Sequence, residues 1–304
     1  MARDRFSQHS WFSQHSWFGR LRQLRLVSAV AGRLPLESLI WLGENLGRQS
    51  SRFDGAKFEI LVENLSRVRP DASRSELEQL ARAGFASYGR YWAETLRLPT
   101  LSTEAIDAGF EVDGYEHLLA TREAGYGPIM VLPHLGGWEW AAAWLGRVAE
   151  IGVSAVVERL EPAEVFEWFT NLRSSYGIEV LPLDDGVFTD LVDAVQRRQV
   201  VCLLGDRDIA GTGVVVDFFG SEVSMPIGPA VLSRRTGAPI HPTAVFFDGK
   251  QRRCIVGEPI WPSGAGRLRD EARETTAKVA KELETFISAA PEQWHVLEPI
   301  FETA

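Results

Sequence analysis

The sequence IMVLPHLGGWEWAAAWLGRVA, residues 129–149, combines three local patterns in succession. Its first four residues are apolar and are typical of a short buried strand. A turn with Pro133, His134 and two glycines follows, and apolar residues then recur at helical spacing over residues 138–149. A strand that leads through a tight turn into a helix is the repeating unit of α/β proteins.

The same alternation of patterns extends along the chain in both directions. Runs typical of strands lie at residues 129–132, 154–157, 178–181, 200–204, 214–219 and 240–247. Helical patterns lie at residues 114–124, 138–149, 162–175, 187–198 and 268–289. Because no low-complexity linker interrupts this order, the sequence predicts a single α/β domain. We expect its six strands to share a central, mostly parallel β-sheet flanked by helices.

Further helices are predicted ahead of the sheet. Ser73 and Glu76 have the spacing of a capping box, which predicts the start of a long helix with apolar positions extending to Leu96. Residues 21–47 have the pattern of two short amphipathic helices that are broken near Pro35.

Charge is distributed unevenly along the chain. Residues 1–33 contain six arginines and one aspartate, a net charge of +5, although the whole chain has a formal net charge of −9. We expect residues 1–20, which repeat the hexapeptide FSQHSW, to be a disordered aromatic and basic tail, and residues 21–304 to form the domain. A basic end of this kind suggests contact with an anionic membrane surface.

The composition limits the class of protein. With 45% hydrophobic and 24% charged residues, the chain has the composition of a globular protein and not that of a disordered or collagen-like one. Its net negative charge argues against nucleic acid as the main partner, because such proteins carry a basic surface. No apolar run approaches the length of roughly 18 residues that a membrane-spanning helix needs.

His134 is the first candidate for catalysis. In open α/β sheets, ligands bind at the carboxyl ends of strands, and His134 follows such an end closely. A neutral imidazole there can take a proton from a hydroxyl group, and the carboxylate of Glu139 can hold the ring in the right tautomer. Gly136 and Gly137 allow close approach to a substrate, and the next helix offers N–H groups to an oxyanion. The plainer interpretation is a turn histidine that caps the helix.

Other polar residues follow other predicted strands. Asp206 and Asp208 come directly after one strand, and Glu158 comes directly after another. Arg173 lies beside the apolar face of the helix that begins near residue 162, a position that suits contact with an anion. We expect these four residues to line a substrate pocket. A loop salt bridge for the aspartates and a plain surface position for Arg173 are the alternatives.

Several common catalytic motifs are absent from the sequence. It has no G-x-S-x-G elbow, no Walker loop, no complete G-x-G-x-x-G, no H-E-x-x-H and no C-x-x-C. The candidate base therefore has no nucleophile of its own in the protein. We expect the substrate's hydroxyl group to attack an activated acyl donor directly, with no metal and no cofactor.

The ordered blocks of the sequence resemble the lipid A biosynthesis acyltransferase superfamily. VLPHLGGWEWA resembles its H-x4-D/E block. The other blocks agree in order and comprise Asn171–Arg173, GDRD followed by DFFG, GPAVLSRRTGAPIHPTAV and PEQWHVLEP. GDRDIAGTGVVVDFFG and ASYGRYWAETLRLP are most similar to the actinobacterial phosphatidylinositol mannoside acyltransferases. The resemblance spans about residues 21–300.

This resemblance implies roles for individual residues. His134 is expected to be the general base and Glu139 its orienting carboxylate, although many members of the superfamily have aspartate at the second position. Arg173, together with Asp206 or Asp208 or both, is expected to line the same pocket.

The resemblance also implies the substrates. We expect a palmitoyl chain to pass from acyl-CoA, as co-substrate, to the 6-hydroxyl of the inositol-2-linked mannose of phosphatidylinositol mannosides. The enzyme is expected at the cytoplasmic face of the plasma membrane, as a peripheral protein on the anionic inner leaflet.

Three alternatives remain open from the sequence. The acceptor can be a lipid A-type glycolipid. Asp206-x-Asp208 also resembles the D-x-D element with which many glycosyltransferases hold a metal ion and a sugar nucleotide. A non-catalytic lipid carrier would keep the hydrophobic groove and the basic terminus but would tolerate loss of His134.

Overall fold

The structure is a computed structural model that describes residues 27–159 and 161–301, so the predictions for residues 1–20 lie outside the described part. Its strands are β1 (Phe110–Asp113), β2 (Ile129–Leu132), β3 (Val153–Val157), β4 (Ile178–Pro182), β5 (Val200–Leu204), β6 (Val214–Phe218), β7 (Ser221–Met225), β8 (Ile240–Asp248) and β9 (Gln251–Val256). Its α-helices are α2 (Leu36–Ser50), α3 (Gly55–Val68), α4 (Arg74–Arg97), α5 (Thr103–Ala108), α6 (Tyr115–Glu123), α7 (Trp138–Arg147), α8 (Ala163–Ser174), α9 (Val187–Gln196), α10 (Gly228–Thr236) and α11 (Leu268–Ala289). Two 3-10 turns are η1 (Leu98–Thr100) and η2 (Pro291–Gln293).

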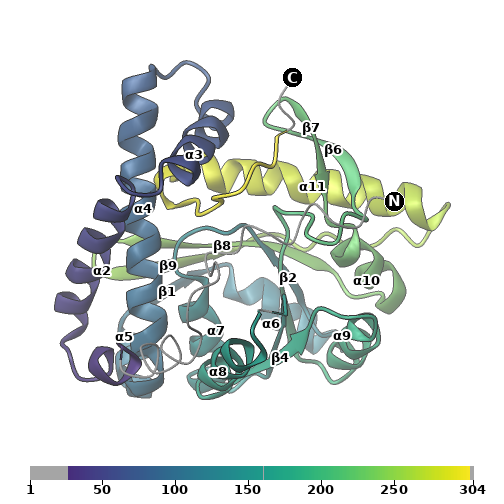
Figure 1. Ribbon diagram of the computed structural model, residues 1–304. Coiled ribbons are helices and arrows are strands. Elements are labelled where there is room, and N and C mark those ends of the chain that lie inside the picture. The colour runs from purple at the N-terminus through teal and green to yellow at the C-terminus, as the bar shows by residue number, and fades with distance from the viewer. Residues whose placement is uncertain (1–26, 160, 302–304) are drawn as a thin grey trace.

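Seven strands form one sheet in the order β1-β9-β8-β2-β5-β3-β4 (Figure 1). Every neighbouring pair is parallel except β8 and β9, which confirms the prediction of a mostly parallel sheet flanked by helices. From β2 the chain passes through α7 to β3, whereas from β5 it returns through α10 to β8, on the opposite side of β2. Strand order therefore reverses around β2, and crevices in open α/β sheets form at such points.

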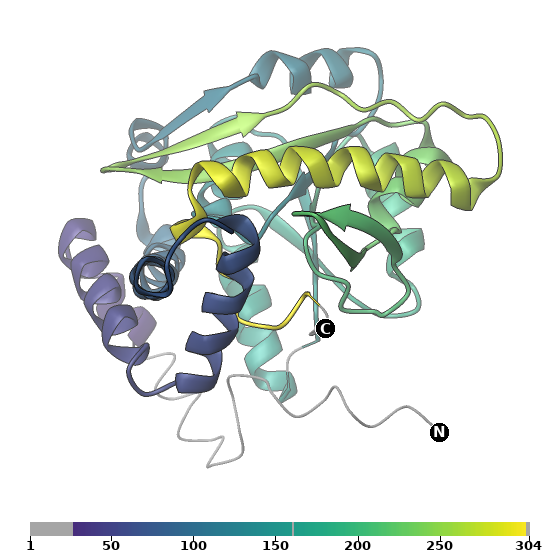
Figure 2. The same cartoon turned by 90° about the horizontal axis from the view of Figure 1, so that it is seen from above.

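The sheet is buried on both faces. Ile129 and Val131 of β2 pack with α9, α10 and α11, whereas Met130 and Leu132 pack with α5, α6 and α7. All four side chains are buried, as expected for a strand in the middle of a parallel sheet. Figure 2 shows α11 lying across the sheet with the β6–β7 hairpin beside it.

The prediction that residues 214–219 belong to the central sheet is wrong. They form β6, which pairs with β7 in a separate two-stranded antiparallel sheet. Its side chains are alternately buried and exposed, which suits a hairpin with one solvated face and not a central strand. Phe219 and Gly220 make the two-residue turn with positive φ angles of 51° and 71°, the backbone that tight hairpins favour.

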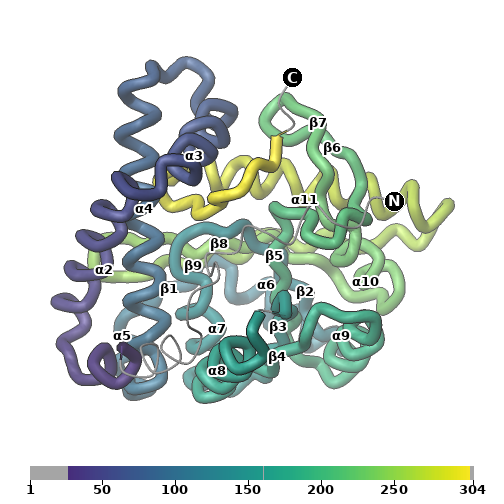
Figure 3. The backbone as a smooth tube through the Cα atoms, viewed as in Figure 1, coloured from purple at the N-terminus to yellow at the C-terminus, as the bar shows by residue number. Residues whose placement is uncertain are grey.

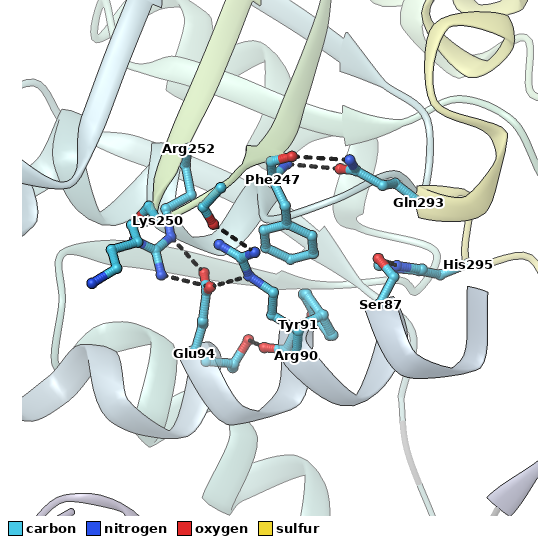
Figure 4. A network of polar contacts seen from close by, with 11 residues as sticks. Ser87, Arg90, Tyr91, Glu94, Phe247, Lys250, Arg252, Gln293 and His295 are labelled. Atoms are coloured by element: carbon cyan, nitrogen blue, oxygen red, sulfur yellow. Dashed lines mark hydrogen bonds and ion pairs between the residues drawn. The ribbon is translucent and has the colours of Figure 1, made fainter. Parts of the chain in front are cut away.

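Strands β1 and β9 were not predicted from the sequence. In β9, Arg252 occupies a fully buried position, at 1% exposure, where an apolar residue is expected. The Nε atom of Arg252 lies 2.8 Å from Oε2 of Glu94 (Figure 4). The guanidinium group of Arg252 stacks 3.8 Å from the ring centre of Trp140. The ion pair with α4 makes burial of this charge possible, and no strand pattern reveals that partner.

The predicted N-terminal helices are present where the structure describes them. Ser73 and Glu76 form the capping box that begins α4, and Pro35 directly precedes α2. Helix α2 packs so closely on α4 that a Cβ atom on Gly47 would lie 2.1 Å from the carbonyl oxygen of Phe85. Figure 3 shows α2, α3 and α4 gathered at one side of the molecule. Within residues 27–159 and 161–301, no helix combines the length and the apolar character required to span a bilayer.

Candidate active site

The site lies just beyond the carboxyl ends of β2 and β5. These strands are neighbours, with Leu132 opposite Leu204, and the N–H of Gly205 donates to the carbonyl oxygen of Leu132 at 2.8 Å. His134 follows one strand and Asp206 follows the other, each two residues beyond this matched pair. The register of two parallel strands therefore places a histidine and an aspartate side by side.

His134 and Asp206 form a closely bonded pair. The Nδ1 atom of His134 lies 2.6 Å from Oδ1 of Asp206, and the main-chain N–H of His134 donates to Oδ2 at 2.8 Å. The side chain of Asp206 is completely buried, whereas that of His134 is 16% exposed. The exposed part of the pair is therefore the imidazole.

Asp206 is held in its charged form. Burial by itself would raise the pKa of Asp206, but the charge of His134 and hydrogen bonds from His134 and Trp294 keep it below the ordinary value. The indole N–H of Trp294 donates to Oδ2 at 2.8 Å. An ionised carboxylate at Nδ1 requires a proton on that nitrogen, which leaves Nε2 of His134 as the basic atom of the neutral ring.

The prediction that Glu139 orients His134 is wrong in its geometry. The Nε atom of Arg173 donates to Oε1 of Glu139 at 2.9 Å, and Nη2 of Arg173 contacts the same oxygen. The hydroxyl groups of Tyr91 and Tyr176 donate to Oε1 at 3.1 Å and to Oε2 at 2.7 Å. Both oxygens of Glu139 are thus engaged by α4, α8 and the segment before β4, whereas the His134 ring is bonded to Asp206.

The Glu139 cluster is a buried charged unit. Burial and the negative charge of Glu139 raise the pKa of both Tyr91 and Tyr176 well above its usual value, so both hydroxyls stay protonated. Burial disfavours the charge of Arg173, but the carboxylate beside it raises the pKa of the guanidinium above its ordinary value. The structure therefore gives Arg173 a partner within the protein, instead of the free anion-binding position expected from the sequence.

Gly136 and Gly137 contact the protein and not an open pocket. Their N–H groups donate to the carbonyl oxygens of Gln293 at 2.9 Å and of Val245 at 3.1 Å. Gly136 has a φ of +62°, and a Cβ atom there would lie 1.9 Å from the oxygen of Val245. The expected close approach to a substrate is therefore a close approach to β8 and to the C-terminal segment.

The start of α7 has free donors. Among the residues that the structure describes, the N–H groups of Trp138 and Glu139 have no acceptor. Such groups at the first turn of a helix favour negative charge.

Asp208 and Glu158 lie apart from the pair. Oδ2 of Asp208 accepts from the N–H of Gly213 at 2.9 Å and from the hydroxyl of Ser224 at 2.7 Å, so it organises the loop before β6. Asp206 and Asp208 thus take different partners and do not converge as a D-x-D metal element requires. Glu158 is exposed and has no hydrogen bond or ion pair with another described residue.

Trp294 and His295 also lie at the site, although neither had a predicted role. The N–H of His295 donates to the carbonyl oxygen of His134 at 2.7 Å, and its Nε2 lies 2.9 Å from the hydroxyl of Ser87 (Figure 4). Burial and the charge of His134 lower the pKa of His295 to about 3, so this ring is neutral. These residues lie about 160 positions after His134 in the sequence, and the PEQWHVLEP block was the sole signal for them.

A histidine bonded to a buried carboxylate at the carboxyl ends of two parallel strands is typical of the active site of an α/β enzyme. Residues 21–303 match the family described as bacterial lipid A biosynthesis acyltransferase. The chain belongs to this family and is an acyltransferase.

Individual relatives agree with this placement. A phosphatidylinositol mannoside acyltransferase of Mycobacterium tuberculosis (strain CDC 1551 / Oshkosh) is 38% identical over 247 residues, which cover 79% of this chain and 76% of that protein. The protein of the same name from Mycolicibacterium smegmatis is 36% identical, with 79% and 78% covered. A lipid A biosynthesis acyltransferase of Haemophilus influenzae is 24% identical, with 89% and 80% covered. The resemblance inferred from the sequence blocks is confirmed.

Proposed function

We propose that this protein transfers a palmitoyl group from acyl-CoA to the 6-hydroxyl of the inositol-2-linked mannose of phosphatidylinositol mannosides. The choice of acceptor is supported by sequence identity. This chain is 36–38% identical to relatives named for that lipid and 24% identical to the relative named for lipid A. The pair of His134 and Asp206 supplies the chemistry that such a transfer needs.

The mechanism follows from the tautomer of His134. Its Nε2 atom takes the proton of the mannose hydroxyl while the oxygen attacks the thioester carbonyl carbon. Asp206, bonded to Nδ1, stabilises the imidazolium that forms. The tetrahedral intermediate then breaks its C–S bond, and coenzyme A leaves with the proton from Nε2. A thiol with a pKa near roughly 8.5 is a good leaving group, so a single imidazole serves both steps.

The free N–H groups of Trp138 and Glu139 are our candidates for the oxyanion donors. They follow His134 by four and five residues and lie at the positive end of the α7 dipole. In this proposal, Glu139 and Arg173 have a supporting role, because their ion pair fixes the start of α7 against α8.

We also propose that the protein docks on the anionic inner leaflet through α2 and the turn that follows it. The side chains of Trp41, Leu46 and Phe53 are 66%, 60% and 85% exposed, and Arg48 and Arg52 are exposed among them. Helix α2 lies at the edge of the molecule, with α4 between it and the sheet (Figure 1). Exposed aromatic residues interspersed with arginine suit an interface with acidic headgroups.

One assay tests the proposal. Labelled palmitoyl-CoA is offered with phosphatidylinositol mannoside and with a lipid A precursor in parallel reactions, and the acylated position is identified by mass spectrometry and NMR. We expect transfer to the mannose 6-hydroxyl. Preferential transfer to the lipid A precursor would replace this acceptor. Undiminished transfer by His134→Ala would refute His134 as the base. No transfer by the wild-type protein to either acceptor would indicate a lipid carrier.

A further inference from the structure

The carboxylate of Asp206 must keep one orientation in order to serve His134. Oδ1 bonds the ring Nδ1 at 2.6 Å, and Oδ2 accepts the main-chain N–H of the same residue at 2.8 Å. Tilting the plane of the carboxylate about its Cβ–Cγ bond would break both contacts together, since they are restored only by a half-turn that exchanges the two equivalent oxygens. Among the described residues, Trp294 is the one donor to Asp206 that does not come from His134.

Trp294 is itself held rigidly. Its side chain is fully buried, and its ring lies against Phe218 and Phe219 of the β6–β7 hairpin, with centroids 6.4 Å and 6.3 Å away. Its backbone forms a β-bridge with Leu135, the residue that follows His134. The indole therefore reaches Asp206 from a fixed frame.

The segment around Trp294 is tied down on both sides. The side chain of Gln293 accepts the N–H of Phe247 at 2.7 Å and donates to its carbonyl oxygen at 3.0 Å, as a neighbouring strand would (Figure 4). On the other side, the side-chain amide of Asn64 on α3 donates to the carbonyl oxygens of Val296 at 3.0 Å and of Glu298 at 2.9 Å. These contacts give the segment 293–298 a fixed position between β8 and the N-terminal helices.

We propose that Trp294 is a positioning residue for the transfer reaction, and that its indole N–H locks the Asp206 carboxylate in the orientation in which both oxygens serve His134. This inference rests on the proposed role of His134 as the base. The ring of Trp294 is buried and acts through Asp206, so we expect it to affect turnover and its pH dependence but not substrate binding.

The test compares two buried tryptophans. Trp294→Phe keeps an aromatic ring and removes the N–H from Asp206. Trp140→Phe is the matched control, because Trp140 is 1% exposed and its indole N–H donates to a carbonyl oxygen, that of Ile106, at 3.0 Å. Each variant is assayed for kcat, KM and the pH dependence of kcat, with thermal unfolding as the measure of stability.

We expect Trp294→Phe to lower kcat about tenfold, the scale of one lost hydrogen bond to a charged group, with KM within about twofold of wild type. With one donor fewer, Asp206 becomes more basic and holds the imidazolium more strongly, so the acid limb of the profile should move to higher pH. Trp140→Phe should lower the melting temperature without moving that limb. If Trp294→Phe shows a lower melting temperature but a wild-type kcat and pH profile, Trp294 is merely structural and the inference is overturned.

A second measurement does not depend on the folding of Trp294→Phe. In the 15N-labelled wild-type protein, the assigned indole resonance of Trp294 should titrate with the midpoint of the acid limb, and His134→Ala should abolish that titration. An indole resonance unchanged across this range would overturn the inference. Failure of the proposed role of His134 would give a different result: His134→Ala would then retain transfer, irrespective of the result for Trp294→Phe.

Discussion

The Nδ1 atom of His134 lies 2.6 Å from Oδ1 of Asp206, although the two residues are 72 positions apart in the sequence. Glu139, five residues after His134, is instead bonded to Arg173, Tyr91 and Tyr176. The two carboxylates thus have different partners: Asp206 bonds the imidazole of His134, and Glu139 belongs to a buried ion pair.

Asp206→Asn should abolish most of the activity. The amide removes the negative charge opposite the imidazolium and can stabilise the wrong tautomer, so we expect kcat to fall by roughly 10²–10⁴ with KM little changed. Steady-state kinetics at pH 7 to 8 measures this loss. Asp208→Asn is the comparison, because its carboxylate bonds the loop before β6. An equal loss of kcat in Asp208→Asn would contradict the assignment of Asp206.

Glu139→Gln should act on stability first. It leaves the buried charge of Arg173 without its partner, and breaking such a pair costs about 3–5 kcal/mol. The double variant Glu139→Met with Arg173→Met should recover part of this loss, because no unpaired charge remains. Urea unfolding measures both effects. A stable Glu139→Gln protein with a displaced pH profile would restore Glu139 as the orienting residue.

Gly136→Ala should be much more damaging than Gly220→Ala. Both glycines have positive φ, of 62° and 71°, so each alanine carries a similar backbone cost of roughly 1–2 kcal/mol. At Gly136 the new Cβ would also meet the carbonyl oxygen of Val245 at 1.9 Å, whereas nothing lies within 4 Å at Gly220. We expect Gly136→Ala to lose at least about 2 kcal/mol more and to lower kcat. Equal stability of the two variants in denaturant would contradict the packing role.

Stability should fall on acidification through His295. Its folded pKa of about 3 is below the ordinary unfolded value of about 6.5, so between these values the unfolded chain binds the additional proton. The contribution of His295 to the free energy of unfolding is constant above about pH 6.5 and falls by roughly 1.4 kcal/mol for each pH unit below that value.

His295→Gln provides the control for this pH dependence. Glutamine can still bond the hydroxyl of Ser87, the partner of Nε2 in the wild type, but it does not titrate. The free energy of unfolding at pH 7, 6 and 5 should therefore decrease less steeply in this variant. Parallel pH dependences in wild type and variant would show that His295 does not titrate as its burial requires.

Substitution of the exposed face of α2 should weaken membrane binding. Trp41→Ser and Leu46→Ser each remove an apolar side chain worth up to about 1.5–3 kcal/mol when fully inserted, so the double variant should bind at least about tenfold more weakly. Sedimentation with vesicles that contain phosphatidylinositol measures this binding. Trp261→Ser is the control, since Trp261 is 47% exposed and lies outside α2. Equal losses in Trp261→Ser would show that α2 has no special role.

Much of the fold was predictable from local patterns. The apolar runs located five of the seven strands of the sheet, and the Ser73 and Glu76 spacing located the start of α4. The run at residues 214–219 was assigned to the wrong sheet, because periodicity identifies a strand but not its partner. Strand β9 was missed because Arg252 is buried through an ion pair with Glu94, which is 158 residues away in the sequence.

The amino-acid sequence alone predicts the α/β class, the acyltransferase family and a position of His134 at the end of a strand. It placed Asp206 at a second strand end for the same reason, since polar residues that follow apolar runs mark the edge of a sheet. Which carboxylate bonds the histidine depends instead on how the elements pack. The parallel register of β2 and β5 brings Asp206 to the ring, whereas the first turn of α7 directs Glu139 towards Arg173. Contacts between distant segments depend on strand order and helix packing, and residue spacing along the chain does not encode these directly.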